Sequence, residues 1–151
     1  MAQAVVVVAL ALGGVGGGER EPRGGRFRAG GAAVAVGLAL RGAGEVGAPV
    51  ARSAALHALT VGAIGALTLG MMARVALGHT GRPLKLPPGM SEAFALVLLA
   101  ALLRVLPPIV APGLYRHGMH AAAGLWAIAF AVFVARYGRA LVGPRVDGRR
   151  G

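Results

Sequence analysis

The sequence contains no cysteine among its 151 residues. This absence excludes disulfide bonds, zinc or iron–sulfur sites with cysteine ligands, and covalent attachment of c-type haem. A metal bound to this chain must therefore be held by histidine, carboxylate, methionine or backbone groups. Histidine is itself scarce, with four residues: His57, His79, His117 and His120.

Charged residues are also few. They make up 14% of the chain, against about 25% in soluble domains, whereas 56% of the residues are hydrophobic. A chain with this few charges cannot form a solvated surface around that much apolar side chain. Lipid is therefore the expected solvent. The sequence predicts an all-α, polytopic transmembrane helix bundle with about five membrane-spanning helices in a lipid bilayer. Its 26 glycines favour close contacts between such helices.

Acidic residues are the rarest charges, with five in total. No two are placed as a pair for acid–base catalysis, and neither a phosphate-binding loop nor a nucleophile–base signature is present, so the sequence leaves open whether the chain is an enzyme. The 16 Lys and Arg residues give a net charge of +11. Because they are spread over loops and helix ends without a DNA-binding motif, we expect no nucleic-acid partner.

Five stretches are predicted to cross the membrane: residues 2–18, 29–47, 54–77, 92–111 and 115–137. The second is weak because it contains Arg41 and Glu45, which are spaced to pair on one helix face. A signal peptide is the alternative for the first, but its start, Met-Ala-Gln, carries no positive charge. Residues 138–151 are predicted to form a basic cytoplasmic tail.

Details within the last two stretches carry further predictions. Ser91-Glu92 is expected to cap the fourth helix, which should end near Leu106 because Pro107-Pro108 follows. Tyr115 and Tyr137, at the ends of the fifth stretch, are expected in the interfacial aromatic belts.

The distribution of Lys and Arg predicts the orientation. With five spans, 12 of the 16 lie on one side of the membrane and four on the other. Because cytoplasmic loops are enriched in these residues, we expect the N-terminus outside and the C-terminus in the cytoplasm. An odd number of spans that starts outside predicts a fragment of a larger protein. Its partners would be the missing N-terminal helices or another membrane subunit.

The third stretch has two distinct helical faces. Small residues recur every four positions at Ala58, Gly62, Ala66 and Gly70, which predicts tight packing against a neighbouring helix. A second, partly polar stripe contains His57, Thr60, Ile64 and Thr68. We expect this stripe to point into the bundle rather than toward lipid.

Residues 57–84 read HALTVGAIGALTLGMMARVALGHTGRPL. This run resembles the NnrS family, polytopic membrane proteins linked to the bacterial response to nitric oxide. The segments Ala101-Leu-Leu-Arg-Val-Leu106, Arg136-Tyr137 and Pro144-Arg-Val-Asp-Gly148 are similar too, so the resemblance covers about residues 50 to 150.

Family members are longer, with about a dozen helices and reported haem and copper. The resemblance therefore implies a bacterial inner-membrane protein that protects against nitric oxide or nitrosative stress with haem, and with copper as a further metal. Two alternatives stay open: a transporter- or channel-like bundle fragment without cofactor, and a truncated, inactive remnant.

The histidines are the candidate metal and haem ligands. His57 and His79 lie within the family-like run, 22 residues apart. On one helix that spacing is about 33 Å, so they cannot share a metal. The alternatives are an interfacial histidine for His57 and a helix-capping loop histidine for His79. His117 and His120 are weaker candidates that could join His57 in a three-histidine outer site, or simply be solvated at the interface.

Arg104 is the remaining candidate for cofactor binding. It is expected well inside the membrane, where an arginine is a functional hypothesis by default. It would pair with a haem propionate or a substrate anion, or extend toward the outer face beside Pro107-Pro108. Trp126 is expected to serve in packing.

Overall fold

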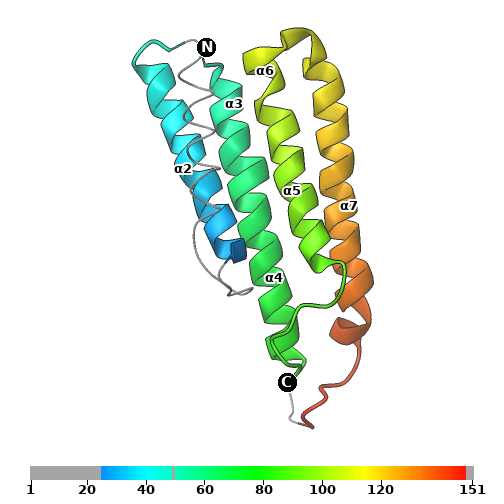
Figure 1. The fold of residues 1–151 in the computed structure, drawn as a ribbon. Coiled ribbons are helices and arrows are strands. Elements are labelled where there is room, and N and C mark those ends of the chain that lie inside the picture. Colours follow the sequence, from blue (N-terminus) through cyan, green and yellow to red (C-terminus); the bar gives the residue numbers. More distant parts are fainter. Residues whose placement is uncertain (1–24, 49, 149–151) are drawn as a thin grey trace.

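The computed structural model describes residues 25–48 and 50–148, and every regular element in this part is helical (Figure 1). The elements are α2 (Gly25–Glu45), α3 (Arg52–His57), η1 (Ala58–Ile64), α4 (Gly65–His79), α5 (Met90–Val105), α6 (Pro107–Val110), η2 (Pro112–Leu114) and α7 (Tyr115–Val142). The prediction of an all-α fold is confirmed.

Three helices in the described part are long and apolar enough to cross a membrane: Arg52–His79, Met90–Val110 and Pro112–Val142. They match the predicted stretches 54–77, 92–111 and 115–137. The stretch 2–18 lies outside the described residues. The weak stretch 29–47 is helical, as α2, but it does not qualify as a span, since six of its 21 residues are glycine and charges lie near both ends. The count of about five is therefore not confirmed.

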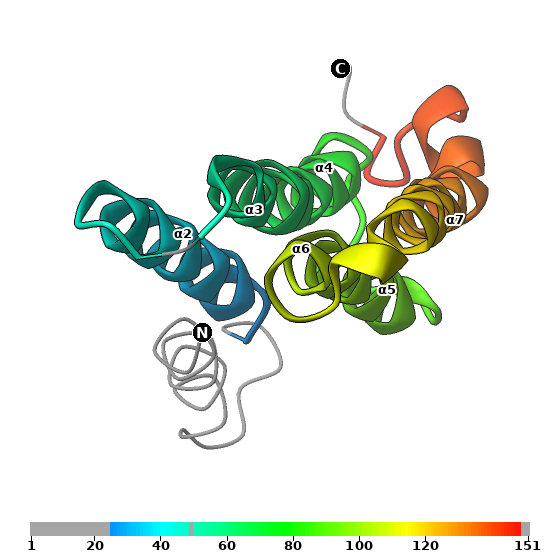
Figure 2. The ribbon, with the colours of Figure 1, turned by 90° about the horizontal axis from the view of Figure 1, so that it is seen from above.

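The helices run alternately up and down, so that neighbours along the chain are antiparallel (Figure 1). Viewed along the bundle, α2 lies beside the long helix formed by α3, η1 and α4, and α5 packs against both that helix and α7 (Figure 2). The main core is formed between α4, α5 and α7, with Leu69, Met90, Val97 and Tyr137 among its fully buried side chains. A smaller core joins α2 to α3 and to the end of α5.

The predicted ridge of small residues is the contact surface of the long helix. Ala58, Gly62 and Ala66 are buried. A Cβ atom added to Gly62 would lie 3.2 Å from the Cβ of Ala101 in α5 and 3.3 Å from that of Ala33 in α2. The ridge therefore lets two helices approach the long helix at one level, and this prediction is confirmed.

The partly polar stripe of the same helix lies elsewhere than predicted. Thr60, Ile64 and Thr68 are exposed on the surface of the described part, while His57 is half-buried. The expectation that the stripe points into the bundle was wrong, because the small residues occupy the side that faces α2 and α5.

Directly after His57 the long helix widens into a π-helix, η1, which the sequence analysis did not predict. The Oγ1 of Thr60 donates a hydrogen bond to the Leu56 carbonyl at 2.9 Å, and the amide of Gly65 reaches back five residues to the Thr60 carbonyl. In an α-helix the Leu56 carbonyl would accept from the Thr60 amide, so the hydroxyl competes for that acceptor. π-Turns within α-helices often mark functional sites.

Two expectations about helix ends were wrong. Helix α5 begins at Met90 with Gly89 as its N-cap, at φ 87°, and no side chain caps it. Ser91 therefore lies within the first turn, and only Glu92 retains the predicted interaction with the helix dipole. Tyr137 is 1% exposed and stacks on Phe133 in the core, with ring centroids 4.8 Å apart, instead of lying in an interfacial belt.

Candidate functional site

The first candidate site lies in the half of the bundle where α3 begins, α5 ends and α7 begins, the upper half in Figure 1. A groove of about 390 Å³ opens there between η1 and α7, with α5 as its floor. It is lined by Thr60, Val61, Arg104, Ala122, Ala123 and Trp126. The groove is thus mostly apolar, with one guanidinium and one hydroxyl.

Arg104 is the charged residue of this groove. Its Nε is buried and has no hydrogen-bond partner in the structure. The other described carboxylates are not available to it: Glu45 pairs with Arg41 at 3.0 Å, as the sequence predicted, and Asp147 pairs with Arg145. Glu92 lies twelve residues earlier on the same helix, about 18 Å away along its axis. The guanidinium therefore has positive charge and donor capacity that no described side chain satisfies.

Trp126 forms one wall of the groove. It is 39% exposed and stacks on Phe130 with a centroid distance of 4.2 Å. Its indole nitrogen would lie 3.1 Å from a Cβ placed on Gly65, so the glycine leaves room for the ring. The packing role predicted for Trp126 is thus only part of its environment, since the ring also borders open space.

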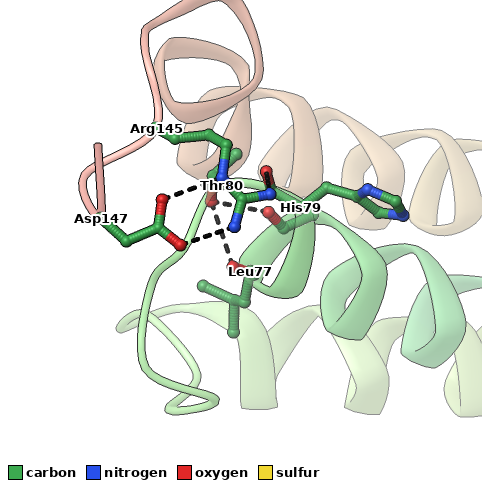
Figure 3. A network of polar contacts seen from close by, with 6 residues as sticks. Leu77, His79, Thr80, Arg145 and Asp147 are labelled. Carbon is green, nitrogen blue, oxygen red and sulfur yellow. Dashed lines mark hydrogen bonds and ion pairs between the residues drawn. The ribbon is translucent and has the colours of Figure 1, made fainter. Parts of the chain in front are cut away.

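The second candidate site lies at the opposite end of the long helix. A groove of about 330 Å³ is lined by Met71, Arg74, Val75, Gly78, His79 and Leu84. The His79 side chain is exposed there and points away from the polar contacts of its own backbone (Figure 3). His57, in contrast, does not line the groove of Arg104.

The chain reverses after His79 through a Schellman motif, the usual glycine-containing end of a helix. Gly81 has φ 68°, its amide bonds the Gly78 carbonyl at 3.2 Å, and the Arg82 amide bonds the Leu77 carbonyl at 2.9 Å. The buried hydroxyl of Thr80 donates a further hydrogen bond to the Ala76 carbonyl at 2.7 Å (Figure 3). The run Gly78-His-Thr-Gly-Arg82 is therefore first of all a helix end.

The last carbonyls of that helix end are satisfied by the other end of the chain (Figure 3). Nη1 of Arg145 donates to the His79 carbonyl at 3.0 Å, and the Val146 amide donates to the Thr80 carbonyl at 3.2 Å. Asp147 holds the guanidinium with two bonds of 2.9 and 2.6 Å. We call residues 144–148, which make these contacts, the clasp.

The first part of the predicted tail, residues 138–148, is ordered and packed against the bundle. Helix α7 continues to Val142, so residues 138–142 are helical, and the clasp that follows packs on α4. The hydrogen bond to Asp147 raises the pKa of Arg145 above its ordinary value. The two family-like segments at 78–83 and 144–148 are thus one structural unit. Sequence reasoning had noted both and had not joined them.

The predicted histidine ligands are not brought together. Within the described part, no group of three or more His, Asp or Glu side chains is placed to hold a metal ion. His117 and His120 are exposed on α7, so the three-histidine outer site is not formed. His57 and His79 lie on one unbroken helix, which keeps them apart as the sequence predicted.

The helices define a polytopic membrane protein with long apolar helices packed through small residues. The model of the NnrS protein family matches residues 25–145, and the chain belongs to this family. The match includes α2, so it begins earlier than the resemblance at about residue 50 had indicated. None of the curated proteins and none of the solved structures compared with the chain matches it.

Proposed function

We propose that this NnrS-family protein serves the bacterial response to nitric oxide with a haem bound by histidine, and that His79 is the iron ligand. The supporting observation is that His79 is the only described histidine that lines one of the grooves, while its own carbonyl is fixed by Arg145. His79 thus combines an exposed imidazole with a backbone carbonyl held by Arg145.

The residues around His79 suit a haem chemically. The imidazole is a usual iron ligand, Met71, Val75 and Leu84 offer apolar contacts, and Arg74 offers a positive charge for a propionate. When bound, the haem iron supplies a position at which a small gas such as nitric oxide binds. The chain's own residues would hold the macrocycle, orient the imidazole and pair the carboxylate.

His57 is the second candidate, near the opposite end of the bundle. It is half-buried and immediately precedes the π-helix. Because the described part has no group of three or more His, Asp or Glu side chains placed for a metal, a copper ion at His57 would need ligands from elsewhere. Those ligands would come from further helices of a larger protein or from another membrane subunit.

The visible absorption spectrum tests the haem proposal. The protein is purified in detergent from haem-sufficient cells, beside His79→Ala, His57→Ala and His120→Ala variants. We expect a Soret band that His79→Ala abolishes or shifts and that the other two retain. His120 is the matched control because it is exposed and lines neither groove.

The other outcomes are equally informative. Loss of the band in His57→Ala alone would move the iron to the other end of the bundle. A colourless wild-type protein would reject haem binding by this chain. The transporter- or channel-like alternative would then remain, although the polar stripe that it needs lies on the surface of the described part.

A further inference from the structure

We propose that the groove of Arg104 binds the phosphate of an anionic membrane phospholipid. Lipid binding there is independent of haem binding at His79, because no histidine lines this groove and the two grooves lie along different halves of the long helix.

The guanidinium of Arg104 has a buried donor, Nε, without an acceptor in the described part. A buried donor without an acceptor is costly in a region of low dielectric, and a buried positive charge without a partner costs more. The Nε of Arg104 is such a donor, and no described carboxylate pairs with the side chain. A phosphate has several oxygens, which match the guanidinium fork with two parallel bonds.

Arg104 lies at a depth from which its side chain can reach the nearer membrane interface. It lies six residues before Val110, the last residue of the span Met90–Val110, or about 9 Å below the end of that span. A long arginine side chain at this depth directs its charge toward the nearer interface, where phosphates lie. A phospholipid headgroup can therefore meet the guanidinium without leaving the interfacial region.

The shape of the groove also suits a lipid. Thr60 and Ala123 at its rim are exposed, so in the described part it opens sideways from the bundle and not into an internal channel. Trp126, eleven residues into α7, forms an apolar wall beside the guanidinium that an acyl chain can contact. One helical turn below Thr60, Ile64 is 58% exposed and offers an apolar surface for an acyl chain.

This part of the bundle carries an excess of positive charge. Two further arginines of this half of the bundle, Arg52 and Arg116, are exposed, and the carboxylate of Glu45 is already paired with Arg41. The excess positive charge favours a headgroup with a net negative charge, such as phosphatidylglycerol, over a zwitterionic one.

The only tryptophan of the sequence gives a direct test, because Trp126 borders the groove. The protein is placed in phosphatidylcholine bilayers, and brominated phosphatidylglycerol, which quenches on contact, is added in steps. We expect quenching that saturates with a preference for phosphatidylglycerol over brominated phosphatidylcholine. Arg104→Gln should weaken that preference about tenfold, the loss of one charge-assisted interaction.

The matched control is Arg116→Gln, which removes an exposed arginine from the same end but outside the groove. It should leave the preference unchanged. Arg104→Lys keeps the charge without the fork and should give an intermediate value, and circular dichroism of each variant checks that the helices are retained.

Three results would overturn the proposal. Equal quenching in wild type and Arg104→Gln would show that the arginine does not select the lipid. Displacement of the brominated lipid by inorganic phosphate would assign the groove to a soluble anion. Displacement by haem would assign the groove to a haem carboxylate. Displacement by haem would reject the lipid proposal whether or not His79 binds iron.

Discussion

Arg145 donates a hydrogen bond of 3.0 Å to the backbone carbonyl of His79, a residue 66 positions earlier in the chain. This bond completes a helix end whose preceding carbonyls are already satisfied by the Schellman motif. A guanidinium at this place also complements the negative end of the α4 dipole. The bond thus connects the chain segment after α7 to the residue that we propose as the iron ligand.

The clasp should come loose when its arginine is removed. In Arg145→Gln we expect faster hydrogen exchange of the Val146 amide, because the turn of Asp147 against α4 loses its anchor. Exchange measured by mass spectrometry on peptides covering 140–148 checks this. Arg139→Gln, at an exposed position in the last turn of α7, is the control, and equal exchange in both variants would contradict the clasp.

Gly81 and Gly78 should respond oppositely to alanine. Gly81 has φ 68°, and a Cβ there would lie 2.7 Å from the carboxyl carbon of Asp147, whereas Gly78 is helical with open space around it. We expect Gly81→Ala to destabilise the protein by about 1–2 kcal/mol and Gly78→Ala to leave it unchanged or stabilise it by up to about 1 kcal/mol. Thermal unfolding in detergent compares the two variants, and similar stability losses in both would argue against this turn.

Gly62 should not tolerate a large side chain. Because Ala101 and Ala33 already lie within 3.3 Å of its absent Cβ, Gly62→Leu must push α2 or α5 away. We expect a loss of about 1–3 kcal/mol, the usual cost of overpacking. Gly124→Leu is the control, since nothing lies within 4 Å of that position. Denaturant titration of both variants measures the difference, and a loss no larger than that of the control would show that the three helices do not meet there.

The absence of cysteine makes the predicted orientation directly measurable. Single cysteines at Lys85 and Leu114, both exposed between helices at opposite ends of the bundle, can be labelled with a membrane-impermeant maleimide in intact cells. With the C-terminus in the cytoplasm, we expect labelling of Leu114→Cys and protection of Lys85→Cys until the membrane is permeabilised. The reverse pattern would invert the proposed topology.

Local signals predicted local features well. The long charge-free run predicted the helix Arg52–His79, and the four-residue spacing of small side chains predicted which side of it packs against a neighbouring helix. The spacing of Arg41 and Glu45 gave their ion pair. Each of these depends on side chains within one helix, so periodicity alone contains the information.

Features that depend on packing between helices were missed. Tyr137 looked like an interfacial residue because of its position near the predicted helix end, but α7 extends to Val142 and the ring faces the core. The polar stripe was placed inside because its residues are polar, whereas the ridge of small residues decides which side is covered. The clasp requires α4 and α7 to end at the same level, which no local pattern reports.

The order in which the clasp is made has a consequence for biosynthesis. The helix end at His79 is translated 66 residues before the arginine that completes it. At about 5–20 residues per second, that interval is about 3–13 seconds. During it, the carbonyls of His79 and Thr80 lack the donors that Arg145 and Val146 later supply, so the helix end depends on its local hydrogen bonds alone. Any truncation before Pro144 would make this temporary state permanent.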